Sequence, residues 1–317
     1  MKITIRVFMI VVLMVTTNIS YGQKKENYLK EENLKECIKY IEEITFEAVG
    51  GEGDVGGYVI RNHNLTKVNR EGNIEFNISR KDSESLIYEY NSKGDIMEVS
   101  FNSAGEYAWR VILDYDDKGN LIESNVDSEN IGIKGKIISQ YDDNGNMIIE
   151  DMYDSEGYLK ERTKRTYDEN KNIISLIKGN ENRVNEIHTY SYDARGNKIY
   201  WTTVQDDEVI RNNTYAYDAN NNLIKWDYLE YSISLKYIYT YDSKGNMIEV
   251  NSYYADGSLK EKLTYEYEYD KKDNWTKKIT YNEFSTLTTI EERKIVYYGD
   301  KDENDYQVWD DLIKPDL

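Results

Sequence analysis

Proline is almost absent from this chain of 317 residues: the single proline, Pro315, lies near the C-terminal end. Proline removes a backbone donor and is confined to the margins of sheets, so a chain without it can hydrogen-bond through nearly every peptide group. Cysteine occurs once, as Cys37, and histidine twice, as His63 and His188. A single cysteine excludes internal disulfides, and this set of ligands excludes a zinc site of the Cys/His type. We expect both histidines to be polar surface residues, and we expect no metal and no cofactor.

Positive charge is also scarce. The chain has 40 Lys and Arg residues against 59 Asp and Glu residues, which gives a net charge of −19. Nucleic acids and anionic membrane surfaces bind to basic faces, so we expect neither as a partner. Acidic pairs such as Asp116–Asp117, Asp142–Asp143 and Asp206–Asp207 lack the spacing of a calcium loop, which predicts solvated turns.

The N-terminal segment has the pattern of a secretion signal. Lys2 and Arg6 are followed by an apolar run from Val7 to Val15, and Ser20-Tyr-Gly22 supplies small residues at a cleavage site. The apolar run is too short to span a bilayer. We therefore expect an exported bacterial protein, periplasmic, surface-bound or secreted, that does not span a membrane after cleavage. An uncleaved anchor and a buried strand are the alternatives.

What the chain has in abundance is tyrosine, 31 residues against five phenylalanines. Eight tyrosines recur at steps of 25, 26, 26, 25, 25, 24 and 28 residues: Tyr90, Tyr115, Tyr141, Tyr167, Tyr192, Tyr217, Tyr241 and Tyr269. A fixed period of this size is the signature of a repeat architecture. A tyrosine ring can cover a neighbour while its hydroxyl reaches water, which suits a thin repeated sheet.

Each of these tyrosines precedes a turn signal. The next residue is Asp in seven copies and Asn91 in the first, and such side chains bond the backbone two residues on. The fourth residue is glycine in five copies, and glycine tolerates the positive φ of a hairpin-closing residue. Asn221 and Asp273 tolerate it less easily. Lys171 fits poorly, and we expect the turn there to be strained or differently shaped.

The residues around these turns alternate as strands do, for example Tyr237, Tyr239 and Tyr241 before a turn and Ile224, Trp226 and Tyr228 after one. A second turn falls midway through many units, as at Asp154–Gly157. We predict an all-β fold, an antiparallel meander of two-stranded repeats that forms one long curved sheet or an open array like a β-solenoid. Roughly 15 or more strands would exceed the usual width of an open sheet.

We divide the chain into a signal peptide (1–22), an N-terminal segment with a capping strand (23–57), a repeat domain (58–298) and an acidic C-terminal tail or cap (299–317). Within the second segment, Ile38–Ala48 is predicted to be a strand, with a helix as the alternative. No linker or change of composition interrupts the repeat domain.

The units beginning at Tyr115, Tyr141 and Tyr241 read Tyr-Asp-x-x-Gly-Asn-Leu/Met-Ile. They resemble the YD-repeat (RHS-type) family of exported bacterial proteins, and the resemblance covers about residues 85–285. The segments starting at Tyr153 and Tyr254 are also similar to MORN-type and antitoxin repeats. In large YD-repeat toxins the repeats form a closed shell around a toxic domain, whereas this chain has about eight units. The resemblance implies a repeat scaffold, with sugar binding described for shorter relatives.

Aromatic rows are the best candidate for a binding surface. Flat rings can stack on sugar rings, so we single out a speculative ligand-binding platform made of Trp201, Trp226, Tyr228, Trp109 and Trp275. The alternative is that the same rows form the packing face of the sheet. We predict no catalytic residue.

The sequence favours an exported, non-enzymatic repeat scaffold that binds glycan or another cell-surface protein. Two other classes stay open: a glycan-active enzyme that uses carboxylates on a sheet face, and an immunity or antitoxin-like protein for a secreted toxin.

The first prediction concerns export. We expect signal peptidase to cleave before Gln23, because small residues precede that position after the apolar run. N-terminal sequencing of exported protein checks this, and a mature chain that still begins at Met1 would contradict it.

Overall fold

The computed structural model describes residues 34, 38–49, 57–70, 72–79, 84–103, 106–128, 133–180 and 182–299. Every regular element within these ranges is a β-strand, which confirms the predicted all-β class. The predicted signal segment, Cys37 and the acidic residues after Gly299 lie outside the described ranges.

The described residues form twenty strands, joined in one sheet. They are β1 (Ile38–Val49), β2 (Gly57–Val68), β3 (Ile74–Ser79), β4 (Glu84–Tyr90), β5 (Ile96–Ser103), β6 (Glu106–Tyr115), β7 (Leu121–Ser128), β8 (Ile133–Tyr141), β9 (Met147–Asp154), β10 (Leu159–Tyr167), β11 (Ile173–Gly179), β12 (Val184–Tyr192), β13 (Lys198–Gln205), β14 (Glu208–Tyr217), β15 (Leu223–Glu230), β16 (Ile233–Tyr241), β17 (Met247–Tyr254), β18 (Leu259–Tyr269), β19 (Trp275–Tyr281) and β20 (Leu287–Tyr297).

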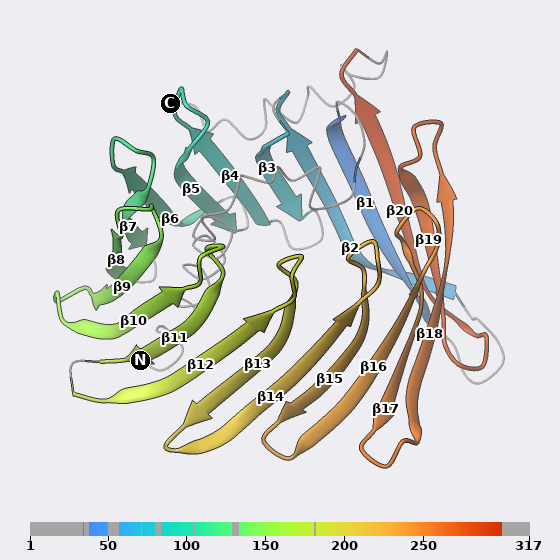
Figure 1. Cartoon of the computed structure of the whole chain (residues 1–317). Coiled ribbons are helices and arrows are strands. Elements are labelled where there is room, and N and C mark those ends of the chain that lie inside the picture. Colours follow the sequence, from blue (N-terminus) through green and yellow to red (C-terminus); the bar gives the residue numbers. More distant parts are fainter. Residues whose placement is uncertain are drawn as a thin grey trace. The chain divides into compact units, whose positions relative to one another are not determined.

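Strands that follow one another in sequence pair antiparallel, as β12 does with β13 and β16 with β17 (Figure 1). The predicted meander of two strands and two turns per unit is therefore confirmed. The strand predicted at Ile38–Ala48 is β1.

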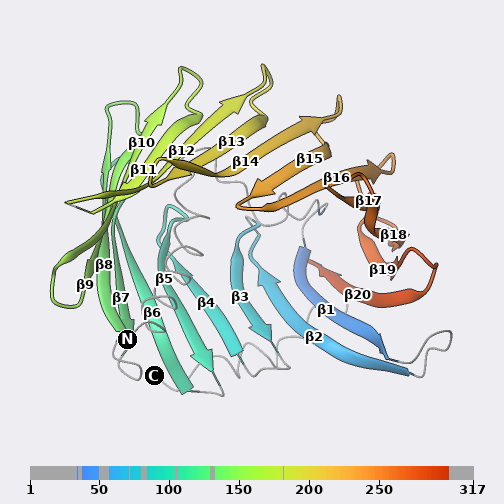
Figure 2. The same ribbon diagram turned by 90° about the horizontal axis from the view of Figure 1, so that it is seen from below.

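The predicted long curved sheet or open solenoid-like array was wrong, because the sheet is closed. Strand β1 pairs with β2 on one side and with β20 on the other, with Ile41 opposite Thr66 and opposite Ile295 (Figure 2). Each strand in the described part of the chain thus has a neighbour on both sides. Closure removes the unpaired edge groups that would otherwise template aggregation.

The described chain divides into two compact units. The terminal unit contains the described residues up to Arg110 and those from Glu266 onward, and the central unit runs from Val111 to Tyr265. Apolar side chains form the core of the terminal unit. Tyr40, Leu65, Phe76 and Val296 make one buried cluster, and Leu34, Ile38, Ile41 and Tyr297 make a second.

The polarity of the buried side chains changes along the central unit. Near its start, apolar side chains such as Val111, Leu121 and Met147 are buried together with polar ones such as Ser124 and Asp151. From β10 onward the buried side chains are polar, including Thr163, His188, Thr203, Asn213 and Ser252. These strands are held by rings and hydrogen bonds more than by an aliphatic core.

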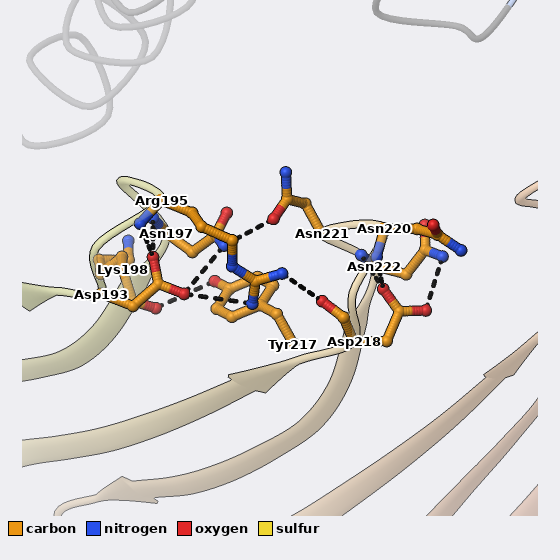
Figure 3. Close-up of polar contacts among 9 residues, drawn as sticks. All are labelled: Asp193, Arg195, Asn197, Lys198, Tyr217, Asp218, Asn220, Asn221 and Asn222. Atoms are coloured by element: carbon orange, nitrogen blue, oxygen red, sulfur yellow. Dashed lines mark hydrogen bonds and ion pairs between the residues drawn. The ribbon is translucent and has the colours of Figure 1, made fainter.

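The repeat turns share one hydrogen-bond pattern, seen in Figure 3 for the turn between β12 and β13. One oxygen of Asp193 accepts from the backbone N–H groups of Arg195 and Asn197, both at 2.9 Å, and the other accepts from the Asn197 amide at 3.1 Å. Gly196 closes the turn with φ 86°. The same positive φ recurs at Gly94, Gly119, Gly145 and Gly245.

Lys171 makes the same turn as the glycines, so of the two expected outcomes, strain or a different shape, the turn shows strain. Its N–H donates to the Asp168 carbonyl at 3.1 Å, and Asp168 N–H donates to the Asn172 carbonyl at 2.9 Å. The backbone of Lys171 adopts φ 66°, a strained value for a residue with a Cβ. Its ammonium donates to the Asn144 carbonyl at 3.0 Å, a tie to the preceding turn that offsets part of this strain.

The repeat tyrosines connect successive units. The hydroxyl of Tyr217, at the end of β14, donates to the carbonyl of Lys198, the first residue of β13, at 3.0 Å (Figure 3). Tyr90, Tyr141, Tyr167, Tyr192 and Tyr241 make the equivalent bond to Ile74, Leu121, Met147, Ile173 and Leu223. We call these bonds the tyrosine latches. Each latch joins one repeat turn to the next.

The turn geometry gives the second prediction. Gly145→Val and Gly245→Val should each destabilise the fold by at least about 1 kcal/mol, because a β-branched residue is strained at positive φ. A Cβ at Gly245 would meet nothing within 4 Å, so strain alone is measured there. Lys171→Val should cost less, since Lys171 already carries a Cβ at positive φ. Chemical denaturation checks this; equal, negligible shifts at the three sites would refute it.

The buried phenols give the third prediction. Burial raises the pKa of Tyr239 to about 12 and also raises the pKa values of Tyr141, Tyr217 and Tyr241. An unfolded tyrosine ionises at about 10, so the folded state holds these protons more tightly. Their stabilisation is complete below about pH 10 and is lost as pH rises toward the folded-state values.

We therefore expect the urea concentration at the midpoint of unfolding to decrease as the pH is raised from about 10 to about 12. Tyr217→Phe, which lacks one latch, should be less stable by about 1 kcal/mol at neutral pH and should lose less in alkali. A midpoint that stays constant across this alkaline range would show that the phenols do not support the fold.

Candidate functional site

The central unit carries a row of stacked rings on one sheet face. Trp226 of β15 lies opposite Tyr215 of β14 and Tyr237 of β16. The ring centroids are 6.1 Å and 5.1 Å from Trp226, with interplanar angles of 17° and 23°. Tyr239 extends the row beyond Tyr237. We call Tyr215, Trp226, Tyr237 and Tyr239 the aromatic row.

Trp226 has both ring faces covered within the row. Tyr228 also meets it edge-on, with centroids 5.2 Å apart. Its indole Nε1 is buried and has no hydrogen-bond partner in the described structure. A sugar ring needs an open aromatic face for stacking, so this geometry makes Trp226 a packing residue.

Trp201 lies on the same sheet face and is covered as well. Tyr190 stacks on it at 6.0 Å, and the Arg211 guanidinium lies 4.4 Å from its ring centroid. Arg211 is held there by an ion pair with Glu230, which also accepts a hydrogen bond from the Tyr228 hydroxyl. These contacts lower the pKa of Glu230, with the Tyr228 hydrogen bond as the largest cause.

The two other tryptophans of the predicted platform belong to the terminal unit. Trp109 stacks on Phe101 at 5.1 Å. The ring of Trp275 is covered by the Arg293 guanidinium at 3.5 Å, and Tyr267 approaches its edge. The structure therefore brings Trp201, Trp226 and Tyr228 into one unit, while Trp109 and Trp275 pack separately.

His188 is buried, so the prediction of a surface histidine was wrong. Its Nδ1 lies 3.0 Å from the Thr203 hydroxyl and 3.3 Å from the Trp201 indole nitrogen, and its Nε2 lies 3.0 Å from Glu186. Burial lowers its pKa. Thr203 is also buried, at 1% exposure, so this hydroxyl–imidazole–carboxylate series has no access to a substrate and ties β12 to β13.

The turn carboxylates are already occupied. Both oxygens of Asp116 accept hydrogen bonds, from Lys118 N–H and from the backbone and side chain of Asn120. The Asn120 amide is the largest cause of the lowered Asp116 pKa. Among the described residues, no group of three or more His, Cys, Asp or Glu side chains is arranged to hold a metal ion.

A cavity of about 430 Å³ opens on the central unit where the first half of β16 lies beside the end of β17 and the hairpin turn that joins β17 to β18. We call it the hairpin pocket. It is lined by Asp227, Ser234, Leu235, Lys236, Ile238, Tyr253, Tyr254, Ala255 and Gly257. None of the five platform residues predicted from the sequence lines it.

The strand register places three of these side chains in a line. Asp227 is opposite Lys236, and Lys236 is opposite Tyr253. Because successive residues of a strand point to opposite faces, this line lies on the other face of the sheet from Trp226 and Tyr237. Asp227, Lys236 and Tyr253 therefore lie on the opposite face of the same strands from the aromatic row, whereas Leu235 and Tyr254, which are opposite each other in the register, lie on the face of the row.

The pocket combines side chains that suit a polyhydroxylated ligand. Tyr253 and Tyr254 have no ring-stacking partner among the described residues, and Tyr254 is 50% exposed. The Asp227 carboxylate accepts from Thr214 at 3.1 Å and pairs with Lys225 at 2.6 Å. Ser234 and Lys236 add a hydroxyl and an ammonium. One signal for this site was visible in the sequence, the tyrosine pair at 253–254, but the residues beside each tyrosine are set by the register between strands.

Comparisons with known proteins identify no family. No protein-family model matches the chain, and no curated protein matches it. Among solved structures, the Tc holotoxin pore of Photorhabdus luminescens aligns with 14% identity and a TM-score of 0.31 over 72% of this chain. This chain spans 15% of that one.

A porin-like protein from Bacteroides uniformis aligns with 12% identity and a TM-score of 0.37, over 82% of this chain and 96% of that one. A porin-like protein from Bacteroides vulgatus gives a TM-score of 0.28. Resemblances at these scores carry no argument about this chain. Within the described ranges, no helix is long and apolar enough to cross a membrane.

The packing of Trp226 gives the fourth prediction. Trp226→Ala should lower the free energy of unfolding by roughly 3–5 kcal/mol, because it empties the space between Tyr215 and Tyr237. Trp226→Phe should cost less, since a ring remains. Thermal and urea unfolding check both variants. An alanine variant as stable as the parent would show that the row does not hold these strands together.

Proposed function

We propose that this protein is an exported, non-enzymatic repeat scaffold that binds glycan in the hairpin pocket. The observation that carries the proposal is the pocket itself, where the unstacked ring of Tyr253 lies on the same sheet face as Asp227, Ser234 and Lys236. Aromatic faces take the C–H surface of a sugar ring, while a few convergent polar groups fix its orientation.

Two sequence features support the rest of the proposal. The recurring tyrosine, aspartate and glycine of the turns supports membership of the YD-repeat class, because each has a defined role in the turn or the latch. The basic start and apolar run before Gln23 support export in a bacterium. A cell-surface or secreted location would bring a glycan within reach.

Binding is favoured over hydrolysis by the carboxylates of the pocket. Glycoside hydrolases generally use two carboxyl groups that flank the scissile bond, about 5–9.5 Å apart. The hairpin pocket is lined by one, Asp227, which already pairs with Lys225. The described lining therefore offers a hydrogen-bond acceptor for a hydroxyl, without the acid and base of a hydrolytic pair.

The fifth prediction tests this function. A glycan array probed with the full-length mature protein should give hits, and Tyr253→Ala should weaken binding to them about tenfold by removing one stacking face. Tyr158→Ala removes an exposed ring at another hairpin and should change nothing. Incubation of the hits with the protein should release no shorter sugar. An array without hits, or hits unaffected by Tyr253→Ala, would refute glycan binding at this pocket.

A further inference from the structure

The charges around the hairpin pocket do not balance. Asp227 is its one lining carboxylate, and the Lys225 ammonium already neutralises it at 2.6 Å. Lys236, directly opposite Asp227 in the register, is exposed and forms no ion pair with any described residue. Two ammonium groups therefore face one carboxylate in a protein whose net charge is −19.

Because the Lys236 ammonium has no ion-pair partner among the described residues, it favours a ligand that carries a negative charge. Lysine acts as a compact point charge toward carboxylate, sulfate or phosphate groups. Beside the ring of Tyr253, the Lys236 ammonium can bind an anionic group carried by a sugar while the sugar ring stacks on the tyrosine. The cavity volume of about 430 Å³ lies within the range of roughly 300–1,000 Å³ that is usual for small-ligand sites.

We propose that the hairpin pocket binds an anionic sugar, such as a uronic acid, through its carboxylate. The inference rests on the proposed glycan binding and adds the charge of the ligand. The Lys236 ammonium pairs with the sugar carboxylate, the Tyr253 ring stacks on the pyranose, and Asp227 and Ser234 bond its hydroxyl groups. The ion pair with Lys225 holds the Asp227 carboxylate in place for this contact.

The experiment compares charged and neutral sugars by titration calorimetry on the full-length mature protein. The probes are methyl β-glucuronide and methyl β-glucoside, with acetate as an acid that has no ring. We expect the glucuronide to bind about tenfold more tightly than the glucoside, as one charge-assisted contact allows, and acetate not to bind. Added salt should weaken the glucuronide more than the glucoside.

Variants locate the effect. Lys236→Gln should reduce glucuronide affinity about tenfold and glucoside affinity much less, since the ionic contact is lost while the glutamine amide can still bond a hydroxyl group. Tyr253→Ala should weaken both sugars. Lys118→Gln makes the same change of net charge in a turn of the central unit and should leave both affinities unchanged. A thermal unfolding curve for each variant confirms that it is folded.

The outcomes separate this inference from the glycan function. Equal affinity for both sugars, or an equal loss with Lys236→Gln and Lys118→Gln, overturns the anionic ligand and leaves glycan binding standing. If all array hits are neutral glycans and their binding is lost with Tyr253→Ala, the anionic ligand is likewise overturned and glycan binding still stands. Acetate binding as tight as the glucuronide would make the site a general anion site and also overturns it. An array without hits removes both proposals.

Discussion

The tyrosine latch is the contact on which the regularity of this structure depends. At each repeat turn the strand register shifts by one residue, as between Ser191 and Tyr192 opposite Lys198. Such a bulge interrupts the ladder of backbone hydrogen bonds. The hydroxyl of Tyr217, one unit later, donates to the carbonyl of Lys198 at 3.0 Å. A unit with a latch thus satisfies a backbone group at the bulge of the unit before it.

The latch accounts for the turn chemistry around it. The residue after each latch tyrosine starts the turn with its side-chain oxygen, and the fourth residue closes the turn at positive φ. Arg195 adds a second tie, donating to the Asp218 carbonyl at 2.6 Å, and the Asn197 amide donates to Asn221 at 3.0 Å (Figure 3). Glycine is therefore replaceable at the fourth position where side chains reach the neighbouring turn, as Lys171 and Asn221 do.

Local pattern was enough to predict the strands, the turns and the period, because each is set by residues within a few positions of one another. Closure of the sheet was not predictable in this way. It depends on β1 meeting β20, where Ile41 faces Ile295 and Glu43 accepts from Arg293 at 2.6 Å across 250 residues of sequence. The environment of His188 and the line from Asp227 to Tyr253 depend in the same way on register between strands, which alternation alone does not specify.

The two faces of the central unit have different roles in our proposal. One face stabilises the fold, and the other is available to bind a ligand. On one face Trp226 is enclosed by tyrosines even though its buried Nε1 finds no acceptor, an omission that typically costs about 1–3 kcal/mol. A tryptophan at position 226 is favourable only if its ring packing outweighs the cost of the unsatisfied Nε1. We therefore infer that this face stabilises the fold. On the other face Tyr253 and Lys236 have no such partners among the described residues, so their interactions are available. A sheet with little aliphatic core needs both faces to differ in this way: rings that stack on each other stabilise the strands, and rings left unstacked are free to bind.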